Sequence, residues 1–151
     1  MTAAASPRAA LALLALLASP LATAQDLLDN GDLGPRVAQL SAAQAASILQ
    51  QGQRNLAELT QRGAGHDGRI LQQGNDHEAH ILQHGDDLLA LIEQFGVGND
   101  ARISQSGSGN QASISQHGAG NHAHIEQVGH GLHSAVTQRG NGQRIDIRQG
   151  R

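Results

Sequence analysis

The sequence predicts an all-β fold, a β-solenoid of five 22-residue strand-turn-strand rungs whose strands form two parallel sheets. Three observations predict it. Glutamine recurs ten times at a constant spacing of eleven residues. The fixed positions within each repeat alternate with variable ones, as residues on the two faces of a strand do. Most repeats also contain a cluster of glycine and asparagine, two residues that tolerate positive φ and favour turns.

The repeats keep their phase from the first glutamine to the last, without insertion or deletion. The recurrent glutamines are Gln50, Gln61, Gln72, Gln83, Gln94, Gln105, Gln116, Gln127, Gln138 and Gln149. An aliphatic residue precedes each by two positions, namely Ile48, Leu59, Ile70, Ile81, Ile92, Ile103, Ile114, Ile125, Val136 and Ile147. Alanine usually stands four positions before the glutamine, and glycine stands two positions after the first nine. The consensus is A-x-I-x-Q-x-G-x-G-N-x.

An eleven-residue period also matches a right-handed helical coiled coil. The residues within the repeat decide against it, because at least one glycine per repeat would cost a helix about 1 kcal/mol each time. We therefore interpret each repeat as a strand of about six residues followed by a turn of about five. One repeat reverses the chain once, so two repeats form a rung. The repeat domain then spans 44–151, with rungs at 44–65, 66–87, 88–109, 110–131 and 132–151.

Parallel stacking places identical residues above one another. The aliphatic column predicts an apolar core between the sheets, worth roughly 1.5–3 kcal/mol for each fully buried side chain. The glutamines predict two amide ladders, one per sheet, because each side-chain amide both donates and accepts hydrogen bonds. Turn asparagines are expected to add a partial ladder; these are Asn55, Asn99, Asn110 and Asn121.

The first 24 residues have the pattern of a signal peptide. Arg8 precedes an apolar stretch at residues 9–18, and Ala22-Thr23-Ala24 fits the small-x-small cleavage pattern, which predicts a mature chain starting at Gln25. A membrane anchor is the alternative, but the apolar run is short for a bilayer span. We expect residues 25–43 to be a flexible leader, and no transmembrane segment after it.

Composition argues against several classes of function. There is no cysteine, the formal net charge is −3, and every basic residue is arginine, so neither thiolate chemistry nor nucleic-acid binding is expected. The nine histidines occupy five repeat positions and form no recurrent ligand set, so we expect a solvated, variable face and no metal site. They are His66, His77, His80, His84, His117, His122, His124, His130 and His133. No catalytic constellation recurs, and we expect neither an enzyme nor a cofactor.

The consensus resembles the curlin repeat, Q-x-G-x-G-N-x-A-x-I-x-Q. Residues 95–105 and 117–127 match that pattern in full, and the resemblance covers about 44–151. It implies a structural subunit of extracellular curli fibres, a functional amyloid that serves adhesion and the biofilm matrix. It also implies export through the periplasm to the cell surface. The implied partners are other copies of the chain, another curlin subunit, an outer-membrane secretion channel and assembly factors.

Within that resemblance the chain is closer to a minor, nucleating subunit than to a major one. Its repeat spacing is unbroken, Leu88 replaces a turn asparagine, and the last unit is degenerate and basic. The basic residues are candidates for surface attachment, with Asp146 the only acid expected nearby; they are Arg139, Arg144, Arg148 and Arg151.

Other features depart from the family pattern. His66 and His77 replace turn asparagines, and the second turn glycine is missing at Arg54, Asp76 and Asp87. These departures predict looser packing of the first rungs.

Two alternatives remain at this point, a major fibre-forming subunit and a monomeric secreted β-solenoid that acts as an adhesin or binds another ligand. A flat binding face would need threonine or an aromatic residue repeated at one outward position. No outward position repeats them.

Overall fold

The computed structural model describes residues 44–150 and contains ten β-strands there. The expected signal peptide, leader and Arg151 lie outside the described residues. The strands are β1 (Ala45–Gln53), β2 (Leu56–Ala64), β3 (Asp67–Asn75), β4 (Glu78–Asp86), β5 (Leu89–Val97), β6 (Asp100–Ser108), β7 (Gln111–Ala119), β8 (His122–His130), β9 (His133–Asn141) and β10 (Arg144–Gly150). Within that range, no helix is long and apolar enough to cross a membrane.

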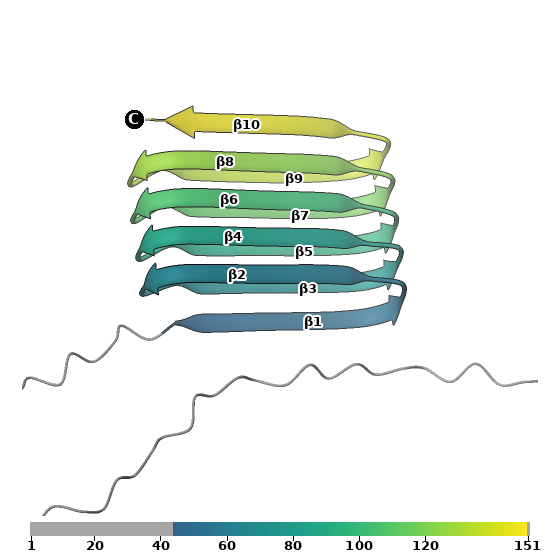
Figure 1. Ribbon diagram of the computed structural model, residues 1–151. Helices are drawn as coiled ribbons and strands as arrows, with labels where there is room; N and C mark the ends of the chain where they lie inside the picture. The colour runs from purple at the N-terminus through teal and green to yellow at the C-terminus, as the bar shows by residue number, and fades with distance from the viewer. Residues whose placement is uncertain (1–43, 151) are drawn as a thin grey trace, which may run out of the picture.

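Successive strands alternate between two parallel sheets (Figure 1). One sheet has the order β1-β3-β5-β7-β9, which we call sheet A, and the other has the order β10-β8-β6-β4-β2, which we call sheet B. Each residue pairs with the residue 22 positions further on, as Ile70 does with Ile92 and Gln72 with Gln94. The predicted β-solenoid of 22-residue rungs is therefore confirmed, and the coiled-coil alternative is wrong.

The predicted lengths of strands and turns are wrong. Nine strands have nine residues each, β10 has seven, and only two residues connect one strand to the next. The reason is the first glycine of the G-x-G-N cluster, which turn propensity predicts to lie in the turn. It lies within the strand and continues the parallel pairing, as Gly74 does with Gly96.

This strand glycine is required by the close approach of successive rungs. Gly74 has φ of 130°, and a Cβ atom built on it would lie 1.9 Å from the carbonyl oxygen of Gly96. Such a separation is far inside van der Waals contact, so a side chain cannot be accommodated without moving the backbone. The same clash recurs at glycines that have a rung beyond them, such as Gly52 and Gly107, which explains why glycine holds this position in the first nine repeats.

The second turn position differs, because it takes a left-handed conformation that non-glycine residues can adopt. Arg54, Asp76 and Asp87 have φ of 56°, 60° and 54°, close to the 65° of Gly98 in a later turn. Arg54 also pairs with Asp76 across the stack, with Nε and Oδ1 2.7 Å apart. The looser packing expected of the first rungs is therefore not found at these turns.

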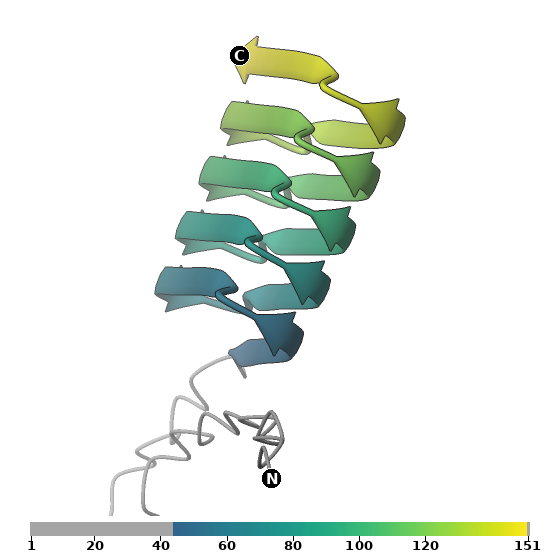
Figure 2. The same cartoon turned by 90° about the vertical axis from the view of Figure 1, so that its right-hand side faces the viewer.

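The two sheets face each other along the stack (Figure 2), and the apolar core lies between them. It contains the stacked isoleucines and the smaller alanines, and Ile92, Ile125 and Ala101 are fully buried. The flanking Ile48, Leu59, Ile145 and Ile147 are only partly buried, because the rungs at the two ends have a neighbour on one side only.

Candidate functional site: ladders, corners and open edges

The structure places the recurrent glutamines inside the solenoid, in one column per sheet. In sheet A, the Nε2 atom of Gln72 donates to Oε1 of Gln94 at 2.9 Å, and Gln94 donates in the same way to Gln116 at 3.0 Å. In sheet B, Gln83 donates to Gln105 at 3.1 Å and Gln105 to Gln127 at 3.0 Å. These side chains are at most 1% exposed.

Each buried amide also bonds to the backbone. The Nε2 atom of Gln94 donates to the carbonyl oxygens of Glu78 and Asn99, both at 2.9 Å. Among the described residues, no buried side-chain nitrogen or oxygen lacks a partner. A buried amide without partners would cost about 1–3 kcal/mol, so the glutamine is stable inside only because the stack satisfies it.

All the ladder bonds run in one direction, from the nitrogen of one rung to the oxygen of the next towards the C-terminus. The columns begin with Gln50 donating to Gln72 at 2.7 Å and Gln61 donating to Gln83 at 3.0 Å. They end with Gln138 accepting from Gln116 at 2.8 Å and Gln149 accepting from Gln127 at 3.2 Å. The N-terminal end therefore presents amide oxygens and the C-terminal end amide nitrogens, so the two ends are complementary.

We call the second residue of each two-residue turn the corner residue, and in the inner turns it is buried, as Asn99 and Asn110 are. The asparagine corners bond to backbone groups of two rungs and not to one another. Asn99 donates to the carbonyl oxygens of Phe95 and Gly118, both at 3.1 Å, and its Oδ1 accepts the backbone N–H of Asn121 at 3.1 Å. Asn55 and Asn110 repeat this pattern, and Asn121 repeats the two bonds to the next rung.

Two of the nine histidines are not on a solvated face, contrary to the expectation. His66 and His77 are corner residues and each is 1% exposed. The sequence does contain a signal for this burial, because both histidines stand at the repeat position that asparagine occupies in the consensus. The prediction of a solvated face did not use that signal. Leu88 occupies a third corner and is also 1% exposed.

Among residues 44–150, no further strand pairs with either end of the solenoid (Figure 1). β1 and β2 end the stack on the N-terminal side, and β9 and β10 end it on the C-terminal side. An uncovered strand edge carries backbone N–H and C=O groups that can pair with another chain. Both ends are therefore candidate assembly surfaces, and their parallel strands have the same 22-residue register as the interior.

The C-terminal arginines do not form one patch. Arg139 lies on β9 of sheet A, whereas Arg144 and Arg148 lie on β10 of sheet B, and Arg151 is outside the described residues. Arg148 has two acidic neighbours instead of the one expected. Its Nε lies 3.3 Å from Asp146 and 3.7 Å from Glu126 of the rung below.

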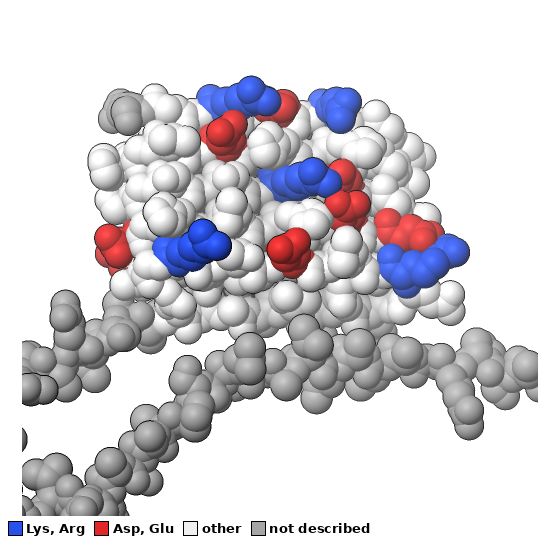
Figure 3. Space-filling model, viewed as in Figure 1, with Lys and Arg blue, Asp and Glu red and all other residues white. Residues whose placement is uncertain are grey.

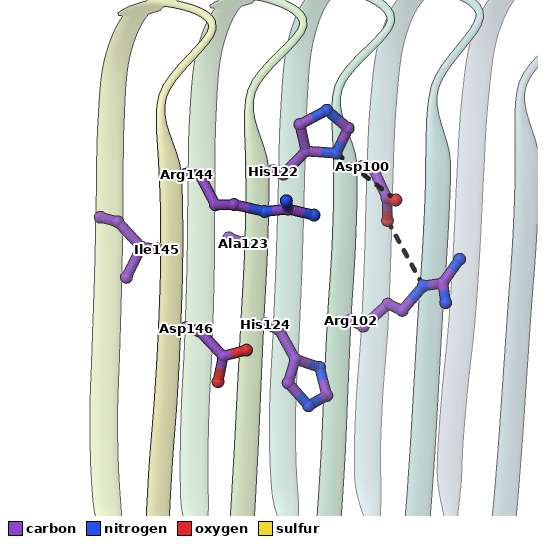
Figure 4. Close-up of a pocket in the computed structure, with 8 residues that line it drawn as sticks. All are labelled: Asp100, Arg102, His122, Ala123, His124, Arg144, Ile145 and Asp146. Carbon is purple, nitrogen blue, oxygen red and sulfur yellow. Dashed lines mark ion pairs between the residues drawn. The ribbon is translucent and has the colours of Figure 1, made fainter.

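The outer face of sheet B carries most of the charged groups in Figure 3, where both signs are interspersed. A cavity of about 350 Å³ lies over β6, β8 and β10 (Figure 4). In this cavity, Oδ1 of Asp100 lies 3.5 Å from Nε of Arg102, and Oδ2 of Asp100 lies 3.6 Å from Nδ1 of His122. His124 and Asp146 also line the cavity, from the neighbouring strands β8 and β10, and no ion pair joins them to Asp100. Among residues 44–150, no three potential ligands gather in a way that could hold a metal ion.

Comparison with known families gives a match at the repeats. The family model described as Curlin associated repeat matches residues 52–85, 67–96, 85–118 and 98–129. These matches together cover more than half of the 151-residue chain. No curated protein matches the chain.

Proposed function

Because the chain belongs to the family of curlin-associated repeats, we propose that it is a structural subunit of extracellular curli amyloid fibres. The observation that carries this proposal is the pair of open, complementary edges. Every strand in the stack already pairs with the strand 22 residues away, so another chain can be added by repeating a contact that occurs eight times within one molecule.

Head-to-tail stacking would continue both sheets. When β1 and β2 of one copy follow β9 and β10 of another, Ile48 lies over Val136, Gln50 over Gln138 and Gly52 over Gly140. Each pair repeats a match found inside the molecule, such as Ile114 with Val136 and Gly118 with Gly140. Stacking would also bury the five core residues that remain partly exposed at the ends. Assembly along this axis is the arrangement of cross-β fibres.

Within the fibre we assign the chain to the minor, nucleating subunit. Its unbroken eleven-residue spacing, the corner Leu88 and the degenerate last rung support this assignment. The side chains of Leu88 and Leu132 cannot accept a hydrogen bond from the backbone N–H of the corner residue in the next rung. The corner column that contains them is therefore less regular than a column of asparagines.

We further propose that the C-terminal rung contacts an anionic partner, such as the cell surface or an acidic assembly factor. Arg144 is exposed on β10, and Arg148 is 71% exposed despite its acidic neighbours. The chain would reach this place as a secreted protein cleaved before Gln25, through the outer-membrane channel that serves curlin subunits. A role in adhesion and the biofilm matrix follows from that location.

The proposal is tested by assembling the purified chain from Gln25 onwards. We expect thioflavin T-positive fibres whose diffraction shows reflections near 4.8 Å and 10 Å, the spacings of paired strands and stacked sheets. A chain that stays monomeric at high concentration, with the same sheet content, would favour the secreted adhesin instead.

The same fibres separate the two subunit roles. Added at a small molar fraction to a major curlin subunit, fibres of a nucleator should shorten its lag phase. No shortening, together with rapid growth of this chain alone, would favour the major subunit.

A further inference from the structure

The buried corner histidines have no part in the proposed assembly surfaces. His66 connects β2 to β3, and His77 connects β3 to β4, so both belong to the second rung. The corners directly above them in the stack are Leu88 and Asn99, which belong to the third rung. Both imidazoles are 1% exposed, so the ring nitrogens depend on the protein for hydrogen bonds.

Each histidine reproduces two of the three hydrogen bonds of a corner asparagine such as Asn99. The Nε2 atom of His77 lies 3.2 Å from the carbonyl oxygen of Gln73, and Nδ1 lies 3.2 Å from the backbone nitrogen of Asn99. In His66 the same atoms lie 3.1 Å from the Arg62 oxygen and 3.4 Å from the Leu88 nitrogen. A carbonyl requires a donor and a backbone N–H requires an acceptor. Both rings must therefore be neutral, with the proton on Nε2.

Protonation is incompatible with this arrangement. A second proton goes to Nδ1, which then points an N–H at the backbone N–H of the third rung. The bond between rungs is lost, and a positive charge is created inside a buried corner. An asparagine at the same place has no such second state, because its amide does not titrate near neutral pH.

The charged groups around the two rings do not compensate for that charge. Below and above His77 are the neutral Asn55 and Asn99. Its charged neighbours in sequence are the carboxylates of Asp76, paired with Arg54, and of Glu78, which contacts His80 and Arg102.

Around His66 the distribution is similar. Asp67 is paired with Arg69, and the carboxylate of Asp87 lies against Gly65 in the turn. The corner above the ring is the apolar Leu88. Neither imidazole has a side-chain carboxylate as a hydrogen-bond partner.

Burial lowers the pKa of His77 below its ordinary value of 6.5, although the carbonyls of Gln73 and Gly96 and the carboxylate of Asp76 oppose the shift. We call the junction closed when the second and third rungs are stacked and open when they have separated. A histidine whose pKa is lowered by stacking binds more protons in the open state than in the closed one. The closed state is therefore most stable above about pH 6.5 and loses stability as the pH falls below that value.

We propose that the junction between the second and third rungs, at the buried corners of His66 and His77, is a pH-sensitive joint, closed while the ring of His77 is neutral and opened when that ring binds a proton. The joint separates the N-terminal assembly edge from the remainder of the stack. In acid, β1 to β4 would loosen, whereas the rungs joined by Asn110 and Asn121 would stay closed.

Amide hydrogen exchange tests the joint on the full-length chain, monomeric or assembled, at pH 7.5 and pH 5.0. Rates are corrected for the chemical exchange of an unstructured chain at each pH. Opening that takes up one proton should become about tenfold more frequent for each pH unit below about 6.5. We expect protection of β3 and β4 to fall at least tenfold at pH 5.0, while protection of β7 and β8 changes less than threefold. Equal changes in both regions would overturn the proposal.

The matched variant is His66→Asn with His77→Asn, which introduces the residue that four other corners already contain. It should fold and lose the pH dependence of β3 and β4. The control is His84→Asn with His117→Asn at outward positions, which should keep that dependence. A corner variant that still loosens in acid would show that other groups are responsible.

Nitrogen-15 NMR provides a second measurement, since a ring protonated on Nδ1 at pH 7.5 would contradict the assigned tautomer.

Because the measurement does not require fibres, its failure is distinguishable from failure of the proposed function. A chain can assemble without a pH-sensitive joint, and a monomer can show the joint without assembling.

Discussion

At the residue scale, the inward polar side chains determine how one rung recognises the next. Gln94 illustrates this, because one amide bonds to Gln72, to Gln116 and to two backbone carbonyls. A ladder bond is worth about 0.5–1.5 kcal/mol when both partners are present. Its larger effect is on specificity, since a rung stacked out of register would leave several buried amides without partners.

The terminal ladder residues should matter for the addition of another chain. We expect Gln50→Ala and Gln149→Ala to lengthen the lag of fibre formation about fivefold, the equivalent of one lost hydrogen bond of ~1 kcal/mol at the templating edge. Arg102→Ala changes an outward side chain of the middle rung and is the control. Sedimentation of soluble chain against time measures all three, and equal lag times would contradict a role for the terminal amides.

At the scale of the strand, glycine within the pairing region allows nine-residue strands to follow one another with only two residues between them. The backbone at Gly74 approaches the Gly96 carbonyl too closely for any side chain. The turn glycines of the later rungs are different, because a Cβ on Gly98 or Gly120 would meet nothing within 4 Å. The two glycines of each consensus repeat therefore have different physical requirements.

Gly74→Ala and Gly120→Ala should separate these requirements. Gly74→Ala forces the backbone of two rungs apart, and we expect it to destabilise the solenoid by more than about 3 kcal/mol, as severe overpacking does. Gly120→Ala introduces no clash. It only forces alanine into the left-handed conformation, which should lower the free energy of unfolding by about 1–2 kcal/mol. Denaturant unfolding of the soluble chain measures both. Similar losses for the two variants would mean that the close approach between rungs is unimportant.

At the scale of the whole molecule, the solenoid is nearly one-dimensional, and each rung contacts only its neighbours. The stability of such a stack is approximately a sum of rung and interface terms. The terminal rung can therefore be removed without unfolding the remainder, and a function confined to it can be tested separately from assembly.

Deletion of residues 132–151 removes the last rung and all four candidate attachment arginines. We expect the shortened chain to polymerise in vitro, because β7 and β8 then present an edge of the same register. It should be shed from cells, because the basic rung that holds it is missing. The fraction of chain in the medium and on the cell surface measures the outcome. Surface retention equal to that of the full-length chain would leave the arginines only a solubilising role.

The sequence by itself determined the period, the alternation and therefore the 22-residue register. A side chain that recurs in phase over ten repeats stacks on its own copies in neighbouring rungs, so the sequence alone predicts the pairing of Gln72 with Gln94. Only the tertiary structure decided the place of the strand glycine and the burial of the corner histidines, because both depend on the distance between rungs. That spacing places Gly74 inside the strand and not in the turn, and makes its hydrogen atom the only substituent that fits. It also buries His66 and His77, since a corner ring is enclosed only once the next rung covers it. Local pattern cannot reveal such contacts, because their partners are 19 to 22 residues away and approach only when the stack has formed.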